Sequence, residues 1–479
     1  MGIDIAQPLR MKRGTGRPFP ANHFVKPRRR GNVNALLGMG LWILLWLGYN
    51  TSYGYVLSPN FSTKPTYFIH GVRAFFPMLA AWLAFVIIFT RSKRVFSWIV
   101  GPLGLMLLYA VIGLISSAAF SPNPTDAMYY GANYLAIVMV LLAIVPVEDP
   151  LPDIRRVLNL TWYVGFLLTL SLLGLIPFLG SQAITETETN PVGVRAYAGE
   201  GQILGMASTR NTGFARYAAI SALVALPRLM RKGNLVVRII WGILFTASFA
   251  ALVIANGRTE TLAFVGSVAV ILGIERTKRT VNFLIGTAGA ILLGLRGFFS
   301  GFYLYITRTG EIDPTMTGRT TTWQEAWHFL WDSPWVGFGF QADRYYLGGQ
   351  HMHNAFLHSF FQAGILGGGA IVIGLLIVWG YILKYFFFQQ PADRSLIPPE
   401  IPAVFLFMTI SSITESTFAY FSAAWLLSAP IVAYVMALHR QMRVILRKAA
   451  QDRALRVWLA RRKARFLGPP LEAPPSTAG

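Results

Sequence analysis

Three histidines lie close together in a polar segment between two long apolar runs. They are His351, His353 and His358, and the chain has only seven histidines. Imidazole titrates near neutral pH, so a histidine here can act as a general base or acid. An H-x-H pair can also bind a metal, but the sequence offers no obviously placed third ligand, so we expect no metal. The alternative, a histidine that ties the loop down by hydrogen bonds, applies most to His358. Asn354 either orients a substrate or caps the following helix.

A second group of chemically capable residues is a set of arginines. When the basic residues in or near the segments that we assign to the cytoplasm are set aside, ten remain, and nine of them are arginine: Lys64, Arg73, Arg195, Arg210, Arg216, Arg258, Arg296, Arg308, Arg319 and Arg344. A guanidinium keeps its charge and fits phosphate oxygens two at a time. Ionisable groups at membrane depth are costly and usually line a cavity. The set predicts a site for a lipid-linked phosphate or diphosphate. The alternative for each arginine is that its side chain snorkels to the membrane interface or pairs with a carboxylate, as Arg258 could with Glu260.

The composition is that of a membrane protein. Of the 479 residues, 54% are hydrophobic and 13% charged, and the mean hydropathy is +0.50, whereas soluble domains are roughly a quarter charged. The net charge of +22 could suggest a nucleic-acid partner. Most Lys and Arg, however, lie in segments that alternate with the apolar runs in one consistent sense, which is the positive-inside pattern. We therefore expect no nucleic acid. The absence of cysteine excludes disulfides and thiolate chemistry.

We expect an all-α polytopic membrane protein with twelve spans of about 20 residues each. Their predicted ranges are 33–50, 70–90, 95–118, 129–147, 157–179, 212–230, 235–255, 258–274, 280–305, 355–387, 402–419 and 421–439. This predicts three parts: a basic cytoplasmic tail (1–32), a transmembrane domain (33–439) with a large periplasmic loop at about 306–354, and a second basic tail (440–479).

The charge pattern also predicts the orientation. The first 30 residues have no apolar core, so we expect a cytoplasmic tail and not a signal peptide. With both termini inside, every cytoplasmic gap carries basic residues, for example "RSKR" at 91–94 and "ERTKR" at 275–279. We expect the bacterial inner membrane, with the polar loop on the periplasmic side. The tail at 440–466 is either an amphipathic helix on anionic lipid or a solubilising charged tail.

The loop itself has the pattern of a short helix. Trp323, Trp327, Leu330 and Trp331 occur at i, i+4, i+7 and i+8, which places them on one face. We expect this helix to rest on the outer membrane interface. The following "PWVGFGF" predicts a glycine-punctuated turn, and "GILGGG" predicts close helix packing by small residues.

These motifs in this order resemble a known family. Arg319 with Trp323, then "SPWVGFGF", then "HN" at 353–354, then "FQAGILG" at 361–367, resemble the bacterial O-antigen ligase and polymerase superfamily of GT-C type glycosyltransferases. "STRNTGFARYAAI" at 208–220 and "ANGRTETLAF" at 255–264 fit as well. The family commonly has Ser before the arginine of the second segment, where this chain has Gly257.

The resemblance implies transfer of a glycan from undecaprenyl diphosphate to an acceptor hydroxyl, without metal or cofactor. It implies His353 as the catalytic residue and Arg210, Arg258 and Arg319 as ligands of the diphosphate. Arg216, Asn354, His351 and Trp323 are secondary candidates, and Tyr345 and Tyr346 could line the site.

The expected partners are the lipid-linked donor, a glycan or lipid A–core acceptor, and membrane lipids. The sequence fits both a ligase and a repeat-unit polymerase, and we prefer the ligase. The basic tail that follows the last span disfavours the protein-glycosylating branch of the family. An alternative of another class is a transporter or flippase of lipid-linked sugars. The concentration of charged residues on one face disfavours it.

Overall fold

The computed structural model describes residues 32–49, 65–90, 92–146, 149–179, 211–231, 233–255, 257–275, 319–387 and 397–467. Within these ranges the regular structure is entirely α-helical, as the sequence predicts. The helices are α1 (Asn32–Leu47), α3 (Pro65–Ala74), α4 (Phe76–Thr90), α5 (Ser92–Ile99), α6 (Pro102–Phe120), α7 (Pro124–Ile144), α8 (Leu151–Leu179), α9 (Asn211–Met230), α10 (Leu235–Ala255), α11 (Arg258–Glu275), α14 (Arg319–Leu330), α15 (Asp343–Tyr346), α16 (Ala355–Phe387), α17 (Glu400–Thr414) and α18 (Ala423–Leu467).

Seven helical stretches in the described ranges are long and apolar enough to cross a membrane, so this is a membrane protein. They are Gly71–Thr90, Pro102–Phe120, Pro124–Ile144, Leu151–Leu175, Leu235–Ala255, Ala355–Tyr385 and Ala423–Asp452. The predicted spans 33–50 and 402–419 appear as shorter apolar helices, Leu36–Leu47 and Glu400–Thr414. Those at 212–230 and 258–274 coincide with α9 and α11, and the span at 280–305 lies outside the described residues. Twelve spans therefore remain a prediction.

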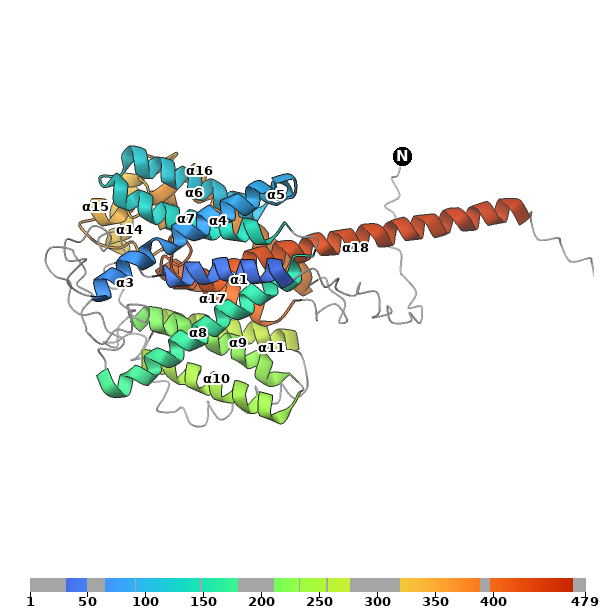
Figure 1. The fold of residues 1–479 in the computed structure, drawn as a ribbon, viewed down its shortest axis with the longest axis horizontal. Helices are drawn as coiled ribbons and strands as arrows, with labels where there is room; N and C mark the ends of the chain where they lie inside the picture. The colour runs from blue at the N-terminus through green and yellow to red at the C-terminus, as the bar shows by residue number, and fades with distance from the viewer. Residues whose placement is uncertain are drawn as a thin grey trace, which may run out of the picture.

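The helices pack side by side into an elongated bundle with α9 in its interior (Figure 1). Nearly all of α9 from Gly213 to Leu226 is buried, and α9 contacts α8, α10, α11 and α17. A second group of contacts joins α6 to α7 and α16, and α4 to α7. α14 and α15 lie at one end of the bundle, and α18 projects from the other (Figure 1).

The C-terminal tail continues the last helix. α18 runs without a break through residue 440, where we expect the tail to begin, and extends well beyond the bundle (Figure 1). The tail is thus helical to Leu467. It follows the direction of the last span and does not form a separate helix.

α16 is broken near its start, and the break pairs with the "PWVGFGF" segment. Ala363 and Gly364 leave the helical conformation, which frees backbone groups on both sides. The Phe338 and Gly339 N–H groups donate to the carbonyls of residues 361 and 362, each at 2.9 Å. The N–H groups of residues 365 and 366 donate to the carbonyls of residues 334 and 335. Buried backbone groups need partners, so the two motifs complete each other.

Gly364 is required for this pairing. Its φ is +60°, and a Cβ there would lie 2.2 Å from the backbone carbonyl carbon of Trp335. The "GILGGG" pattern predicts helix–helix packing. At Gly364 the close contact is instead with the backbone of Trp335 and Val336, which enters the broken helix. The pairing fixes the polar segment (residues 319–354) on top of α16.

Candidate functional site

The polar segment (residues 319–354) encloses a small apolar core of its own. This core comprises Ala326, Phe338, Ala342, Leu347, Met352 and Phe361. Two side-chain hydrogen bonds from α14 hold the segment of the chain that precedes α16. Trp323 Nε1 donates to Met352 O at 2.6 Å, and Thr322 Oγ1 donates to Gln350 Oε1 at 2.6 Å. The histidines that follow are therefore held close to the start of α14.

The short helix predicted within the polar segment is confirmed as α14. The residues predicted to form one face of it, however, differ in their exposure. Leu330 is buried, whereas Trp327 and Trp331 are 52% and 65% exposed. The buried face is formed by Thr322, Ala326 and Leu330. The two exposed indoles are in edge contact at 6.0 Å. Exposed tryptophans at one end of a helix bundle are typical of a membrane interface.

Three basic side chains from distant parts of the sequence converge on Glu415. This residue directly follows α17 and is 5% exposed. His353 Nδ1 lies 3.3 Å from its Oε2, and Arg216 Nη1 lies 3.5 Å from the same oxygen. Arg319 Nη2 lies 3.3 Å from Oε1, and its Nη1 also donates to Thr414 O at 2.6 Å. The polar segment, α9 and the end of α17 thus meet at one carboxylate.

The environment keeps Glu415 ionised. Burial alone would raise the pKa of its carboxyl, but Arg216, the hydrogen bond with His353, and Arg319 outweigh it and hold the pKa well below 4.5. An ionised carboxylate can only accept hydrogen bonds. His353 must therefore donate Nδ1–H to Glu415, which leaves Nε2 as the ring nitrogen that can take up a proton.

His353 has an unusual backbone conformation. Its φ is +47°, a region that non-glycine residues occupy rarely and that is concentrated at functional sites. Asn354 comes next, and its Oδ1 accepts from Leu357 N–H at 3.0 Å. Of the two roles considered for Asn354, this contact is that of a helix cap. Because the cap fixes the start of α16 two residues after His353, it also fixes the position of the His353 imidazole.

The other two histidines of the segment belong to a buried network around Asp343. His351 Nδ1 lies 2.8 Å from Asp343 Oδ2, and His358 Nε2 lies 3.2 Å from Asp343 Oδ1. The Met352 N–H also donates to Asp343. Burial lowers the pKa of His351 to about 3, although its hydrogen bond to Asp343 opposes this shift. His351 is therefore a poor proton acceptor.

This network is also the group in the described part of the chain that could hold a metal ion. The ligand atoms of Asp343, His351 and His358 all lie within 4.8 Å of one another. A metal site on His351 and His353 lacked a third ligand in the sequence. In the structure the rings of these two histidines lie 4.8 Å apart, but the group of possible ligands combines His351 with His358 and Asp343. Hydrogen bonds satisfy part of this group, but Asp343 Oδ1 and His358 Nδ1 are buried without a hydrogen-bond partner among the described residues.

The arginines predicted to bind diphosphate fall into separate groups. Arg210 lies outside the described residues, as do Lys64, Arg195, Arg296 and Arg308. Arg73 donates to the carbonyls of Leu47 and Tyr49, and Arg344 donates to Gly349 O. Arg216 and Arg319 meet at Glu415.

Arg258 begins α11 beside the same part of α9. A Cβ on the preceding Gly257 would lie 2.6 Å from the Cβ of Ala215, which is the neighbour of Arg216. This close approach gives a physical reason for glycine where the family commonly has serine. Glu260, one turn into α11, is buried and interacts electrostatically with Arg216 and Arg319.

Two aromatic residues considered as lining residues have structural partners. Tyr345 Oη is bonded to Asn123 at 2.8 Å and to Asp126 at 3.3 Å. Tyr346 Oη donates to Phe120 O at 3.4 Å. Both side chains attach α15 to the turn between α6 and α7. Trp323, through its bond to Met352, supports the chain next to His353.

Glu415 and Asp343 are the residues that sequence reasoning missed. Glu415 fell inside the predicted span 402–419, where an ionisable residue is by default a candidate for function. Asp343 had no comparable signal, because its role depends on contacts with His351 and His358 that only the folded loop creates.

Comparison with known families supports the resemblance. Residues 242–372 match the family model described as O-antigen ligase. The match includes Arg258, Arg319 and His353, and it ends before Glu415. No curated protein matches the chain. The matched family suggests enzymatic glycosyl transfer at a membrane. The O-antigen ligase match at residues 242–372 therefore supports the resemblance to the O-antigen ligase-like superfamily.

Proposed function

We propose that this protein is a metal-independent glycosyltransferase of the ligase type, which moves a glycan from undecaprenyl diphosphate to an acceptor hydroxyl. The observation that supports it most is the convergence of His353, Arg216 and Arg319 on Glu415. It brings a candidate proton acceptor and two candidate phosphate-binding groups together from α9, the polar segment and the end of α17. The family match extends over the segments that carry His353 and Arg319.

In this proposal His353 is the general base. Nε2 takes the proton of the acceptor hydroxyl as its oxygen attacks the anomeric carbon of the donor. The new carbon–oxygen bond forms while the bond from the anomeric carbon to the diphosphate oxygen breaks, and the electron pair leaves with undecaprenyl diphosphate. Such proton transfer typically contributes 10² to 10⁴ in rate. Glu415 is a positioning residue, because it fixes the tautomer and the ring orientation of His353.

The arginines stabilise the charge that grows on the leaving diphosphate. Arg216 and Arg319 bring two positive charges to Glu415, and Arg258 adds a third from the start of α11. With Glu415 and Glu260 counted as charged, one net positive charge remains among these residues. Arg210 directly precedes α9 in the sequence and would add another. Preorganised cations of this kind do the work that a metal ion does elsewhere.

The remaining predictions fit this function. We propose the inner membrane, with both termini in the cytoplasm and the polar segment (residues 319–354) in the periplasm, where a lipid-linked glycan meets its acceptor. The division into a basic tail at 1–32, a twelve-span domain at 33–439 and a second tail at 440–479 belongs to the same proposal. Lipid A–core is the proposed acceptor.

A reconstituted assay tests the proposal. Purified protein in vesicles would receive an undecaprenyl-diphosphate glycan and either core lipid or a second donor molecule. Transfer of a glycan to the core lipid is expected. Chain growth on the second donor would instead identify a repeat-unit polymerase. Movement of the donor across the bilayer without a new glycosidic bond would refute the enzyme and identify a transporter.

A further inference from the structure

A second charged site lies at the opposite end of the bundle from Glu415. α17 separates the two, because Glu400 is its first residue and Glu415 follows its last. Fifteen helical residues span about 22 Å. Around Glu400 is a cavity of about 300 Å³ that is lined by the start of α8, the end of α9, the start of α10 and Tyr434 of α18. This volume is at the lower end of the range for small-molecule sites.

The interior of this cavity is built around one fixed arginine. Arg228 Nη2 donates to Asn159 Oδ1 at 2.8 Å, and Arg228 Nε lies 3.9 Å from Glu400 Oε1. Its guanidinium also lies 4.7 Å from the ring centre of Trp241 and 5.4 Å from that of Trp162. Contacts on several sides hold the group in one place, so it is preorganised to bind a ligand.

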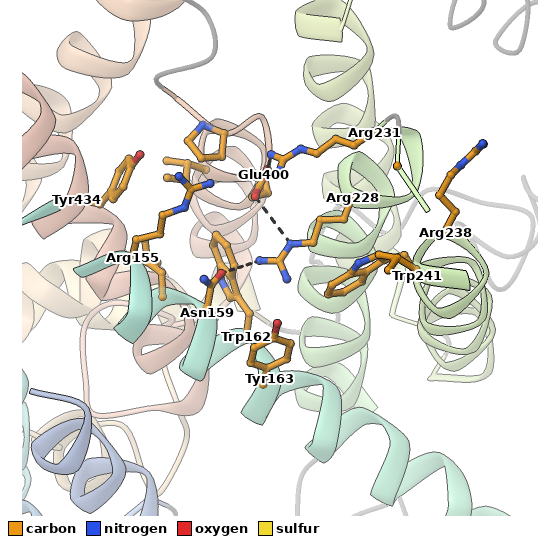
Figure 2. Close-up of a pocket in the computed structure, with 15 residues that line it drawn as sticks. Arg155, Asn159, Trp162, Tyr163, Arg228, Arg231, Arg238, Trp241, Glu400 and Tyr434 are labelled. Atoms are coloured by element: carbon orange, nitrogen blue, oxygen red, sulfur yellow. Dashed lines mark hydrogen bonds and ion pairs between the residues drawn. The ribbon is translucent and has the colours of Figure 1, made fainter. Parts of the chain in front are cut away.

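The cavity carries more positive charge than its single carboxylate neutralises. Arg155, Arg228 and Arg231 extend toward Glu400 from different sides, and Arg238 points away from them (Figure 2). Glu400 is buried, and Arg231 lies 3.3 Å from it with a side chain that is 45% exposed. Arg155 is exposed and makes no hydrogen bond or salt bridge with another residue in the described ranges. Three guanidiniums around one carboxylate leave two positive charges for a ligand.

The surroundings indicate where that ligand comes from. Indole rings such as those of Trp162 and Trp241 are typical of the level of lipid headgroups. The helix that begins at this cavity, α10, exposes Val236, Ile240 and Ile243. A phosphate in the cavity would therefore have a continuous apolar surface beside it. Basic pockets between transmembrane helices on the cytoplasmic side are suited to anionic headgroups.

We propose that this cavity binds the phosphate of an anionic phospholipid, with the headgroup on Arg155, Arg228 and Arg231 and the acyl chains along α10. The guanidinium forks provide the paired donors that phosphate oxygens accept. The site is separate from the proposed glycan-transfer site, and it does not depend on that activity.

Native mass spectrometry of the purified full-length protein tests the site. Phosphatidylglycerol is expected to bind in preference to phosphatidylcholine. The Arg155→Gln/Arg231→Gln variant should reduce this preference by about fivefold for each arginine. Arg156→Gln is the matched control, because Arg156 is also exposed on α8 but pairs with Asp153 at 3.4 Å. An equal loss in Arg156→Gln would overturn the proposal, since the preference would then be a general surface-charge effect.

A photoreactive phosphatidylglycerol, with its reactive group in the head, gives an independent readout. Cross-links are expected at Trp162 and Trp241, and they should disappear in the double variant. Millimolar inorganic phosphate should leave these cross-links in place if the acyl chains contribute to binding. Complete displacement by inorganic phosphate, or cross-links elsewhere only, would refute a phospholipid as the ligand.

Discussion

His353 Nδ1 lies 3.3 Å from Glu415 Oε2, although 62 residues of sequence separate the two side chains. The same carboxylate oxygen faces Arg216 at 3.5 Å. A buried carboxylate that accepts from a histidine on one side and from arginines on others fixes all three in place. This relationship connects the polar segment to α9 and α17, and several expected outcomes depend on it.

We expect His353→Ala to lower the rate of glycan transfer by 10² to 10⁴, because it removes the proposed general base. Membrane insertion and expression should persist. His328→Ala is the matched control, since His328 is exposed on α14 of the same segment. His351→Asn tests the competing base and should retain far more activity than His353→Ala. Full activity of His353→Ala in the reconstituted assay would show that this histidine is structural.

Replacement of Glu415 by Gln is expected to destabilise the protein by about 3 kcal/mol, because it leaves buried guanidiniums without their carboxylate. The folded-state pKa of Glu415 is below its ordinary value of 4.5. Its charge therefore stabilises the fold fully above that value, and the contribution is lost as the pH falls below it. Thermal unfolding of the wild type, measured from pH 7 down to pH 3, should show this loss of stability. The Glu415→Gln variant should lack this part of the pH dependence. Parallel curves for the two proteins would contradict the assignment.

The arginines at Glu415 should be sensitive to loss of the guanidinium fork even when the charge is kept. We expect Arg216→Lys and Arg319→Lys each to reduce kcat by 10² to 10³, the typical effect of removing one preorganised donor to a developing negative charge. Arg344→Lys is the control, because Arg344 bonds to Gly349 within the same polar segment. Kinetics with the lipid-linked donor would test this. An equal reduction in all three variants would mean that the arginines act only through stability.

Gly364→Ala should strongly destabilise the protein. A Cβ would lie 2.2 Å from Trp335 and the residue would have to keep φ at +60°, so the pairing between α16 and the "PWVGFGF" segment must open. Gly369→Ala, on the same helix with no atom within 4 Å of its Cβ, should be neutral or stabilise by about 0.5–1 kcal/mol. Detergent-solubilised yield and melting temperature measure both. Similar melting temperatures for the two variants would argue against the pairing.

Chelation of divalent metal with EDTA is expected to leave glycan transfer unchanged, because arginines take the place of a metal in the proposed reaction. If EDTA inhibited transfer and added Zn²⁺ restored it, the metal-independent mechanism would be wrong. Asp343→Asn would then show whether the Asp343, His351 and His358 group is the site, because this change should abolish the rescue by metal.

The sequence by itself determined the class of the protein and the identity of several key side chains. Its apolar runs of about 20 residues predict membrane-spanning helices, which satisfy their backbone hydrogen bonds internally. The order of Arg319, "SPWVGFGF", His353 and "FQAGILG" indicated the resemblance that the family match at residues 242–372 supports. The short helix at 319–330 also followed from its periodicity. These properties depend on short stretches of the chain, so they can be predicted from the sequence alone.

The tertiary structure decided which of these residues meet. It gave His353 and His351 different carboxylate partners, although their rings lie only 4.8 Å apart: His353 bonds to Glu415, and His351 bonds to Asp343. It joined two glycine-rich motifs through backbone bonds, whereas the sequence indicated only a turn and a packing surface. Contacts between residues tens to hundreds of positions apart have no periodic signal in the chain. They depend on how α9, α16 and α17 pack together, which is why the partners of Glu415 became apparent only in the folded protein.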